Sequence, residues 1–411
     1  MEIVKKIIRD LVLSEKADPL VVDQLKIAHW PAFENAFTQN KLSPQLLPLI
    51  INQLAEGQVK LIFQSFHRHY SFEIIKENHI LQIQRKRIFT LLNEHAIDAV
   101  FLKGQLLAEE GKDRVTRDLD ILVHVSQLSK IIKIMANEGY KFVSSEIVRH
   151  FTPRERKNVL STLSWYNEFH FFSKKTGLLV EFHTNLFPRA RVNPENLEAL
   201  WANRPLIFEN IQFVEESGLR YKVLSSEIQV IQTSVIINVK RSPSKLAFSL
   251  RDLSDLKNLC SRNIDWSRLE KLSEGLQVKY HVFSALALLN RFMKNVVPEN
   301  LLSQWKSFLK PSELFMYRLH MRCMKDLLDY HPIYPWVYRL LRIFILGGRG
   351  RVFEKLYFLR KMIMPSRWFI IDKYGLSKEN PFIVFYYFLL PLNNIFILLK
   401  RIFGIKEVPK K

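Results

Sequence analysis

The chain has 411 residues, of which 48% are hydrophobic and 25% charged, so it exceeds the usual size of one compact domain and its composition excludes a disordered chain. Its two cysteines, Cys260 and Cys323, are too few for a disulfide framework or a zinc cluster, and we expect ordinary reduced thiols. The net charge of +21 favours polyanionic partners, namely nucleotides, nucleic acid or an anionic membrane surface.

Residues 1–95 are predicted to form a helical N-terminal lobe. Apolar residues recur there at helical spacing, for example at Ile74, Ile75, Ile83 and Ile88. The opening residues contain no apolar run that ends in a small-residue cleavage site, so we do not expect a secretory signal. Together with the reduced thiols, this predicts a cytoplasmic protein.

Residues 96–187 are predicted to form a small mixed α/β sheet, because short apolar runs alternate here with two helical stretches and with turn residues. Gly139 is expected to end the helix as the glycine that follows its last turn. The expected elements, in chain order, are a strand at 96–102, the first turns of a helix at 105–110, a strand at 118–125, a helix at 126–138, a short strand at 141–143, and two strands at 167–173 and 177–183.

Residues 188–334 are predicted to be mostly helical, with a short hairpin at 206–221. The expected fold class is therefore α+β, with a small mixed-sheet core between helical N-terminal and C-terminal lobes. Residues 335–411 form a basic, aromatic C-terminal segment with 15 Lys and Arg against 4 Asp and Glu. This composition suits an anionic membrane interface or, less well, nucleic acid, and the alternative is a basic helical lobe whose aromatic residues are core.

The apolar stretch 382–399 is near the lower length limit for a membrane span. Pro391 and the pair Asn393-Asn394 interrupt it. We therefore interpret it as a buried or interfacial helix pair, which leaves a peripheral position at the inner face of a membrane open.

The most informative motif is Asp118-Leu119-Asp120 at the start of an apolar strand. Side chains alternate along a strand, so the two carboxylates point to the same side and repel each other. A divalent cation would offset this repulsion, and hard Mg²⁺ prefers carboxylate oxygens. The alternative for an isolated Asp-x-Asp is a solvated strand end.

Glu181 is a third candidate, because a lone acid in an apolar strand is costly to bury unless it is paired or binds a cation. Three carboxylates on neighbouring strands can hold two metal ions about 3.5–4 Å apart. Gly104, which follows the strand at 96–102, would let the backbone approach a phosphate, and Lys103 would add positive charge. Arg117 is a candidate phosphate contact or the partner in a structural ion pair.

The order of these motifs resembles the polymerase-β-type nucleotidyltransferase superfamily, and more closely an uncharacterised bacterial nucleotidyltransferase family often found with surface-polysaccharide genes. The resemblance is strongest over 96–187 and covers most of the chain. The matching segments are Leu102-Lys103-Gly104, Arg117 to Val123, Gly139-Tyr140, Glu181-Phe182-His183, Leu224 to Glu227, and Ile264-Asp265-Trp266.

The resemblance implies that Asp118, Asp120 and Glu181 bind Mg²⁺ or Mn²⁺ and that Lys103, Gly104 and Arg117 contact a nucleoside triphosphate. The implied reaction is transfer of a nucleotidyl group to an acceptor hydroxyl, in surface-polysaccharide biosynthesis. Alternatives are an inactive scaffold with the same fold, a nucleic-acid-modifying enzyme and a membrane-associated binding protein.

Two histidines accompany these acids in the predicted strands. His183 lies two residues after Glu181 and shares its face, where it could orient Glu181, bind metal or act as a base, although a hydrogen-bonded structural role is favoured. His170 on the preceding strand has the same alternatives, with a structural role favoured.

Overall fold

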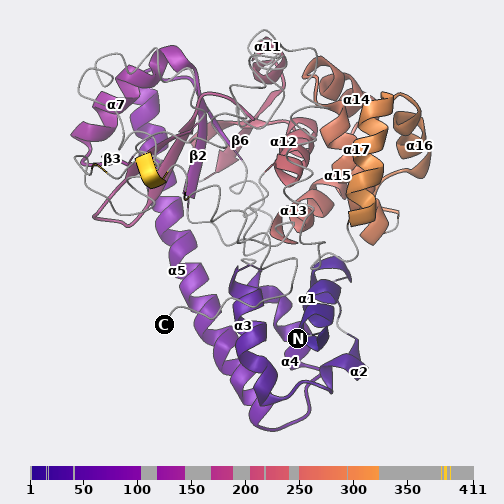
Figure 1. Cartoon of the computed structure of the whole chain (residues 1–411). Helices are drawn as coiled ribbons and strands as arrows, with labels where there is room; N and C mark the ends of the chain where they lie inside the picture. The colour runs from indigo at the N-terminus through magenta and orange to yellow at the C-terminus, as the bar shows by residue number, and fades with distance from the viewer. Residues whose placement is uncertain are drawn as a thin grey trace.

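A computed structural model gives the fold, and Figure 1 shows three groups of elements: N-terminal helices at the bottom, a sheet at the upper left and further helices at the right. This is the α+β architecture predicted from the sequence, with a mixed sheet between helical lobes. The structure describes residues 2–14, 16, 18–39, 42–102, 118–143, 168–187, 204–216, 219–239, 250–293, 295–323, 381, 384–386 and 389.

The N-terminal lobe is built of short helices packed on the first half of a long helix, α5. Its core contains the fully buried side chains of Ile7, Phe33 and Phe37, and Phe63 of α5 packs among them. Figure 1 shows α5 running from this lobe to the sheet. The elements are α1 (Glu2–Ser14), α2 (Pro19–Val22), η1 (Ile27–His29), α3 (Trp30–Gln39), η2 (Pro44–Leu46), α4 (Pro48–Ile51) and α5 (Gln58–Glu94).

The described strands form one seven-stranded mixed sheet of order β3-β4-β5-β2-β1-β7-β6. The central strand β2 runs antiparallel to β1 and parallel to β5. The hairpin predicted at 206–221 is present as β6–β7 but spans 211–224, because residues up to Phe208 belong to a short helix. Strand β7 pairs with β1 in the same sheet, so the sheet takes strands from both sides of residue 187. The strands are β1 (Ala99–Phe101), β2 (Asp118–Val123), β3 (Lys141–Val143), β4 (Glu168–Phe172), β5 (Leu179–His183), β6 (Ile211–Glu216) and β7 (Leu219–Leu224).

One face of the sheet is apolar and covered by the end of α5 and by α7 (Leu128–Asn137), which follows η3 (Val125–Gln127). Because side chains alternate along a strand, every second residue of β2, β4 and β5 enters this core. The side chains that do so are Leu119, Ile121, Val123, Phe169, Phe171, Val180 and Phe182. The residues between them, including the candidate acids, must therefore lie on the opposite face.

A second helical group comprises α11, which precedes β6 in the chain, and the helices that follow β7. Its core also takes up Val100 and Leu122 from the face opposite α7. Cys260 is a buried free thiol, and burial raises its pKa to about 12, which fits an inert structural cysteine. The helices are α11 (Arg204–Phe208), α12 (Ser226–Val239), α13 (Leu250–Cys260), α14 (Trp266–Gly275), α15 (Lys279–Phe292), α16 (Glu299–Ser307) and α17 (Pro311–Cys323).

Little of the basic C-terminal segment is described. Within the part of the chain that the structure describes, no helix has the length and apolar character that a membrane crossing needs. Of the apolar stretch 382–399, only 384–386 and 389 are described. The helix-pair interpretation of this stretch and the membrane interpretation of 335–411 therefore lie outside the described residues and stay predictions.

Gly139 ends α7 with a φ of +78°, as the sequence predicted for the residue after the last helical turn. A Cβ added there meets no atom within 4 Å, so the cost of a side chain comes from the backbone alone. We expect Gly139→Ala to lower the free energy of unfolding by about 1–2 kcal/mol, measured by urea denaturation. Gly139→Asn should lose less, because Asn tolerates this conformation, and equal losses in both variants would contradict this explanation.

Candidate functional site

The candidate site is a row of polar side chains across three neighbouring strands. In the strand register, Asp120 of β2 pairs with Glu181 of β5, and Glu181 pairs with His170 of β4. His183 lies two residues after Glu181 and therefore on the same side of the sheet. All four occupy the face opposite α5 and α7, where their side chains are partly exposed.

Two imidazoles flank the two carboxylates of this row. The Nε2 atom of His183 is hydrogen-bonded to Oδ1 of Asp120 at 3.0 Å and lies 3.9 Å from Oε2 of Glu181. The Nε2 atom of His170 lies 3.6 Å from Oε1 of Glu181. Because an ionised carboxylate only accepts hydrogen bonds, Nε2 of His183 is the donor to Asp120.

The electrostatics of Glu181 reflect this crowding. Burial, together with the negative charges of Asp120 and Asp118, raises the pKa of its carboxyl from 4.5 to about 7, against the opposing effect of His170 and His183. The carboxyl therefore keeps its proton to a higher pH than an ordinary glutamate does. A positive charge bound between Asp120 and Glu181 would remove the repulsion and favour the ionised form.

The donor set fits a divalent cation. Among the described residues, Asp120, Glu181 and His183 each offer one ligand atom, and these atoms all lie within 4.8 Å of one another. Two carboxylate oxygens and one imidazole nitrogen are common ligands of divalent metal ions in proteins. The row can therefore act as a metal centre on one face of the sheet.

Asp118 lies at the start of β2, two residues before Asp120 and on the same face. Its charge contributes to the raised pKa of Glu181, but its oxygens are not part of the group of three ligand atoms. The structure thus brings Asp120 and Glu181 together, while the metal roles of all three acids stay predictions. The expected phosphate contacts Lys103, Gly104 and Arg117 lie outside the described residues.

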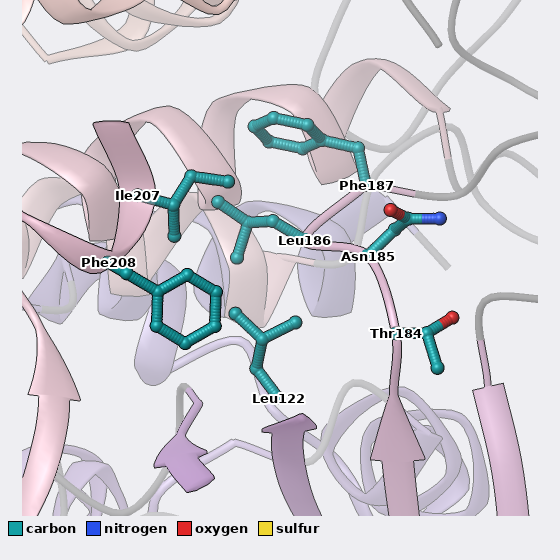
Figure 2. A pocket seen from close by; sticks show the side chains of 7 residues that line it. All are labelled: Leu122, Thr184, Asn185, Leu186, Phe187, Ile207 and Phe208. Atoms are coloured by element: carbon teal, nitrogen blue, oxygen red, sulfur yellow. The ribbon is translucent and has the colours of Figure 1, made fainter. Parts of the chain in front are cut away.

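A small cavity lies where β5 ends, beyond the polar row. Figure 2 shows the apolar side chains of Leu122, Leu186, Ile207 and Phe208 converging there, with Thr184 and Asn185 directed away from them. Its volume is about 10 Å³, roughly the room for one water molecule. This cavity cannot hold a nucleotide, and the apolar contacts instead fix the end of β5 against α11.

For both His183 and His170 the sequence favours a structural role over the functional alternatives. The non-local pairing of β5 with β2 and β4 sets the two imidazoles against Asp120 and Glu181, and the roles of both histidines stay predictions. The available sequence signal was the two-residue spacing of Glu181 and His183. No local signal indicates that His170 pairs with Glu181 across the hairpin.

Comparison with known families gives one finding that bears on this site. A family model described as "Uncharacterised nucleotidyltransferase" matches residues 27–294, which is more than half of the chain and includes every described strand. Comparison with curated proteins gives no significant match.

Proposed function

The chain belongs to the uncharacterised nucleotidyltransferase family, and from this premise we propose that it transfers a nucleoside monophosphate from a nucleoside triphosphate to an acceptor hydroxyl. The observation that carries the proposal is the cross-strand pair Asp120–Glu181, which joins two carboxylates on an accessible face of the sheet inside the matched region. Such a pair suits phosphoryl chemistry, in which charge neutralisation and positioning provide most of the catalysis.

In the proposed reaction the acceptor oxygen attacks the α-phosphorus. The bond from this phosphorus to the oxygen that bridges to the β-phosphate breaks, pyrophosphate leaves with the bonding electrons, and the hydroxyl proton passes to the carboxylate of Glu181. Glu181 is suited to this step because it would bind the cation beside the acceptor hydroxyl, within reach of the proton that must leave.

Asp120 and Glu181 would hold a divalent cation, Mg²⁺ or Mn²⁺, and Asp118 would add a carboxylate at the start of β2. When bound, the cation supplies charge neutralisation for the phosphates and makes the hydroxyl easier to deprotonate. Lys103, Gly104 and Arg117 are proposed to contact the phosphates of the nucleotide.

Nucleotide binding tests the proposal first. We expect one or more of the four nucleoside triphosphates to raise the melting temperature in Mg²⁺ or Mn²⁺ but not in EDTA, because a ligand of the native state stabilises it by mass action. Pyrophosphate release and transfer of an α-labelled phosphate group should then be screened with that nucleotide. A folded protein that shows no shift with any triphosphate at millimolar concentration contradicts the proposal and favours an inactive scaffold.

The wider context is proposed from the resemblance and the composition. We place the acceptor in surface-polysaccharide biosynthesis, and we propose that the basic segment 335–411 contacts an anionic membrane from the cytoplasmic side. In the proposed organisation a helical lobe (1–95), a nucleotidyltransferase core (96–187) and a mostly helical lobe (188–334) precede that segment.

A further inference from the structure

We propose that His183 is a direct metal ligand, so that the centre has a mixed oxygen and nitrogen donor set that favours a first-row transition-metal ion such as Mn²⁺ over Mg²⁺. The inference rests on the proposed function only in placing the metal between Asp120 and Glu181. It concerns which ion binds and through which atoms, and it does not depend on the reaction that follows.

The position of the imidazole supports this assignment. Nε2 of His183 lies 3.0 Å from Oδ1 of Asp120 and 3.9 Å from Oε2 of Glu181, so one nitrogen reaches both carboxylates of the pair. Only 14% of the His183 side chain is exposed, so bulk water has limited access to this nitrogen. An ion that takes one oxygen from each carboxylate would therefore have the Nε2 atom beside it. The proton that Nε2 donates to Asp120 in the metal-free protein would leave this nitrogen when the ion binds, because only the unprotonated nitrogen has a lone pair for the metal.

A nitrogen donor matters because it changes which ions bind well. Mg²⁺ demands oxygen ligands in a near-ideal octahedron and gives up its waters reluctantly. Imidazole suits first-row transition-metal ions, and among these Mn²⁺ is the one that also takes the carboxylate and water oxygens that Mg²⁺ prefers. Replacing one carboxylate or water oxygen by the nitrogen of His183 should therefore shift the selectivity of the site away from Mg²⁺.

His170 has a different geometry and provides the matched control. It lies on the other side of Glu181, with Nε2 3.6 Å from Oε1, and it is not part of the group of three ligand atoms. We assign it to positioning: it contacts the Glu181 carboxylate from β4 and orients it toward Asp120. Replacing His170 should therefore weaken metal binding, but the bound ion should keep its nitrogen ligand from His183.

The direct test is pulsed EPR of the full-length protein loaded with Mn²⁺ alone, without nucleotide. We expect coupling from an imidazole nitrogen on the bound Mn²⁺, and labelling histidine with ¹⁵N should change that coupling. This measurement uses the unmodified chain, so it does not depend on any variant folding correctly.

The paired variants His183→Gln and His170→Gln then locate the nitrogen. Gln at 183 keeps an amide that can donate to Asp120 but offers no imidazole, so the nitrogen coupling should vanish, whereas His170→Gln should retain it. Titrations followed by calorimetry should show the Mn²⁺ affinity of His183→Gln falling by at least the roughly 10–100-fold that losing an outer partner costs. The affinity for Mg²⁺ should fall less, so the ratio of the Mn²⁺ affinity to the Mg²⁺ affinity should be smaller in this variant than in the wild type.

Each result separates this inference from the proposed reaction. Bound Mn²⁺ without nitrogen coupling, or an unchanged preference for Mn²⁺ over Mg²⁺ in a folded His183→Gln protein, overturns the inference and leaves nucleotidyl transfer standing. Nitrogen coupling that disappears in His170→Gln and persists in His183→Gln also overturns it. Nitrogen-ligated Mn²⁺ in a protein that binds no nucleoside triphosphate upholds the inference and contradicts the proposed reaction. If the protein binds no Mn²⁺, the result contradicts the metal centre on which both this inference and the proposed reaction depend.

Discussion

Replacing Asp120 by Asn is expected to remove metal-dependent nucleotide binding and to slow nucleotidyl transfer by about 10³-fold or more, since a bound metal contributes several kcal/mol and each 1.36 kcal/mol is tenfold in rate. Asp120 is central because it pairs with Glu181 across β2 and β5 and also accepts a hydrogen bond from His183. Its amide analogue keeps the shape and loses the charge. The measurements are the nucleotide-induced melting shift in Mg²⁺ or Mn²⁺ and the rate of pyrophosphate release.

Asp98→Asn is the matched control. Asp98 precedes β1 and forms an exposed ion pair with Lys222 at 2.6 Å. It lies at the opposite end of β1 from Leu102, whose amide donates to the carbonyl of Asp120, so about 13 Å of strand separates Asp98 from that contact. This variant should keep full nucleotide binding. A folded Asp120→Asn protein with wild-type activity would exclude Asp120 from the site.

Local sequence patterns predict which residues share a face of the sheet. The alternation of Leu119 and Ile121 with Asp118 and Asp120 places the apolar pair in the core and the acids on the other side, and the structure agrees. The same reasoning applies to Val180, Glu181 and Phe182 in β5. This part of the fold is predictable because the side-chain period of two is a property of a single strand.

The pairing of strands is what the sequence alone does not supply. Asp120 and Glu181 are 61 positions apart, and their contact depends on β5 lying parallel to β2 in one particular register. Likewise, the local sequence predicts the hairpin β6–β7, but it does not predict that β7 pairs with β1 and so joins the sheet. Such non-local pairings follow from the packing of the whole domain, so the sequence named the candidate acids and left the role of His183 open.

Glu181→Gln is expected to stabilise the metal-free protein at pH 8, although it would destroy the proposed metal centre. In the folded chain burial, followed by the charges of Asp120 and Asp118, raises the pKa of Glu181 from 4.5 to about 7. A raised pKa means that the contribution of this group to stability is fully present below pH 4.5 and is lost as the pH rises through about 7. The loss is on the order of 3 kcal/mol in the free energy of unfolding.

The test is urea unfolding of wild type and Glu181→Gln in EDTA at several pH values from 5 to 8. The advantage of the variant should be small at pH 5 and grow to about 2–3 kcal/mol at pH 8, because only the wild-type carboxyl must ionise in a crowded, buried place. Asp120→Asn removes the second cause of the shift, so it should reduce this pH dependence without abolishing it. Saturating Mn²⁺ should reverse the order at pH 8, since the ion stabilises only the protein with both carboxylates. If the difference in the free energy of unfolding between wild type and Glu181→Gln stays constant with pH, the pKa of Glu181 is not raised in the folded protein. The main electrostatic reason to expect a cation beside Glu181 would then be lost.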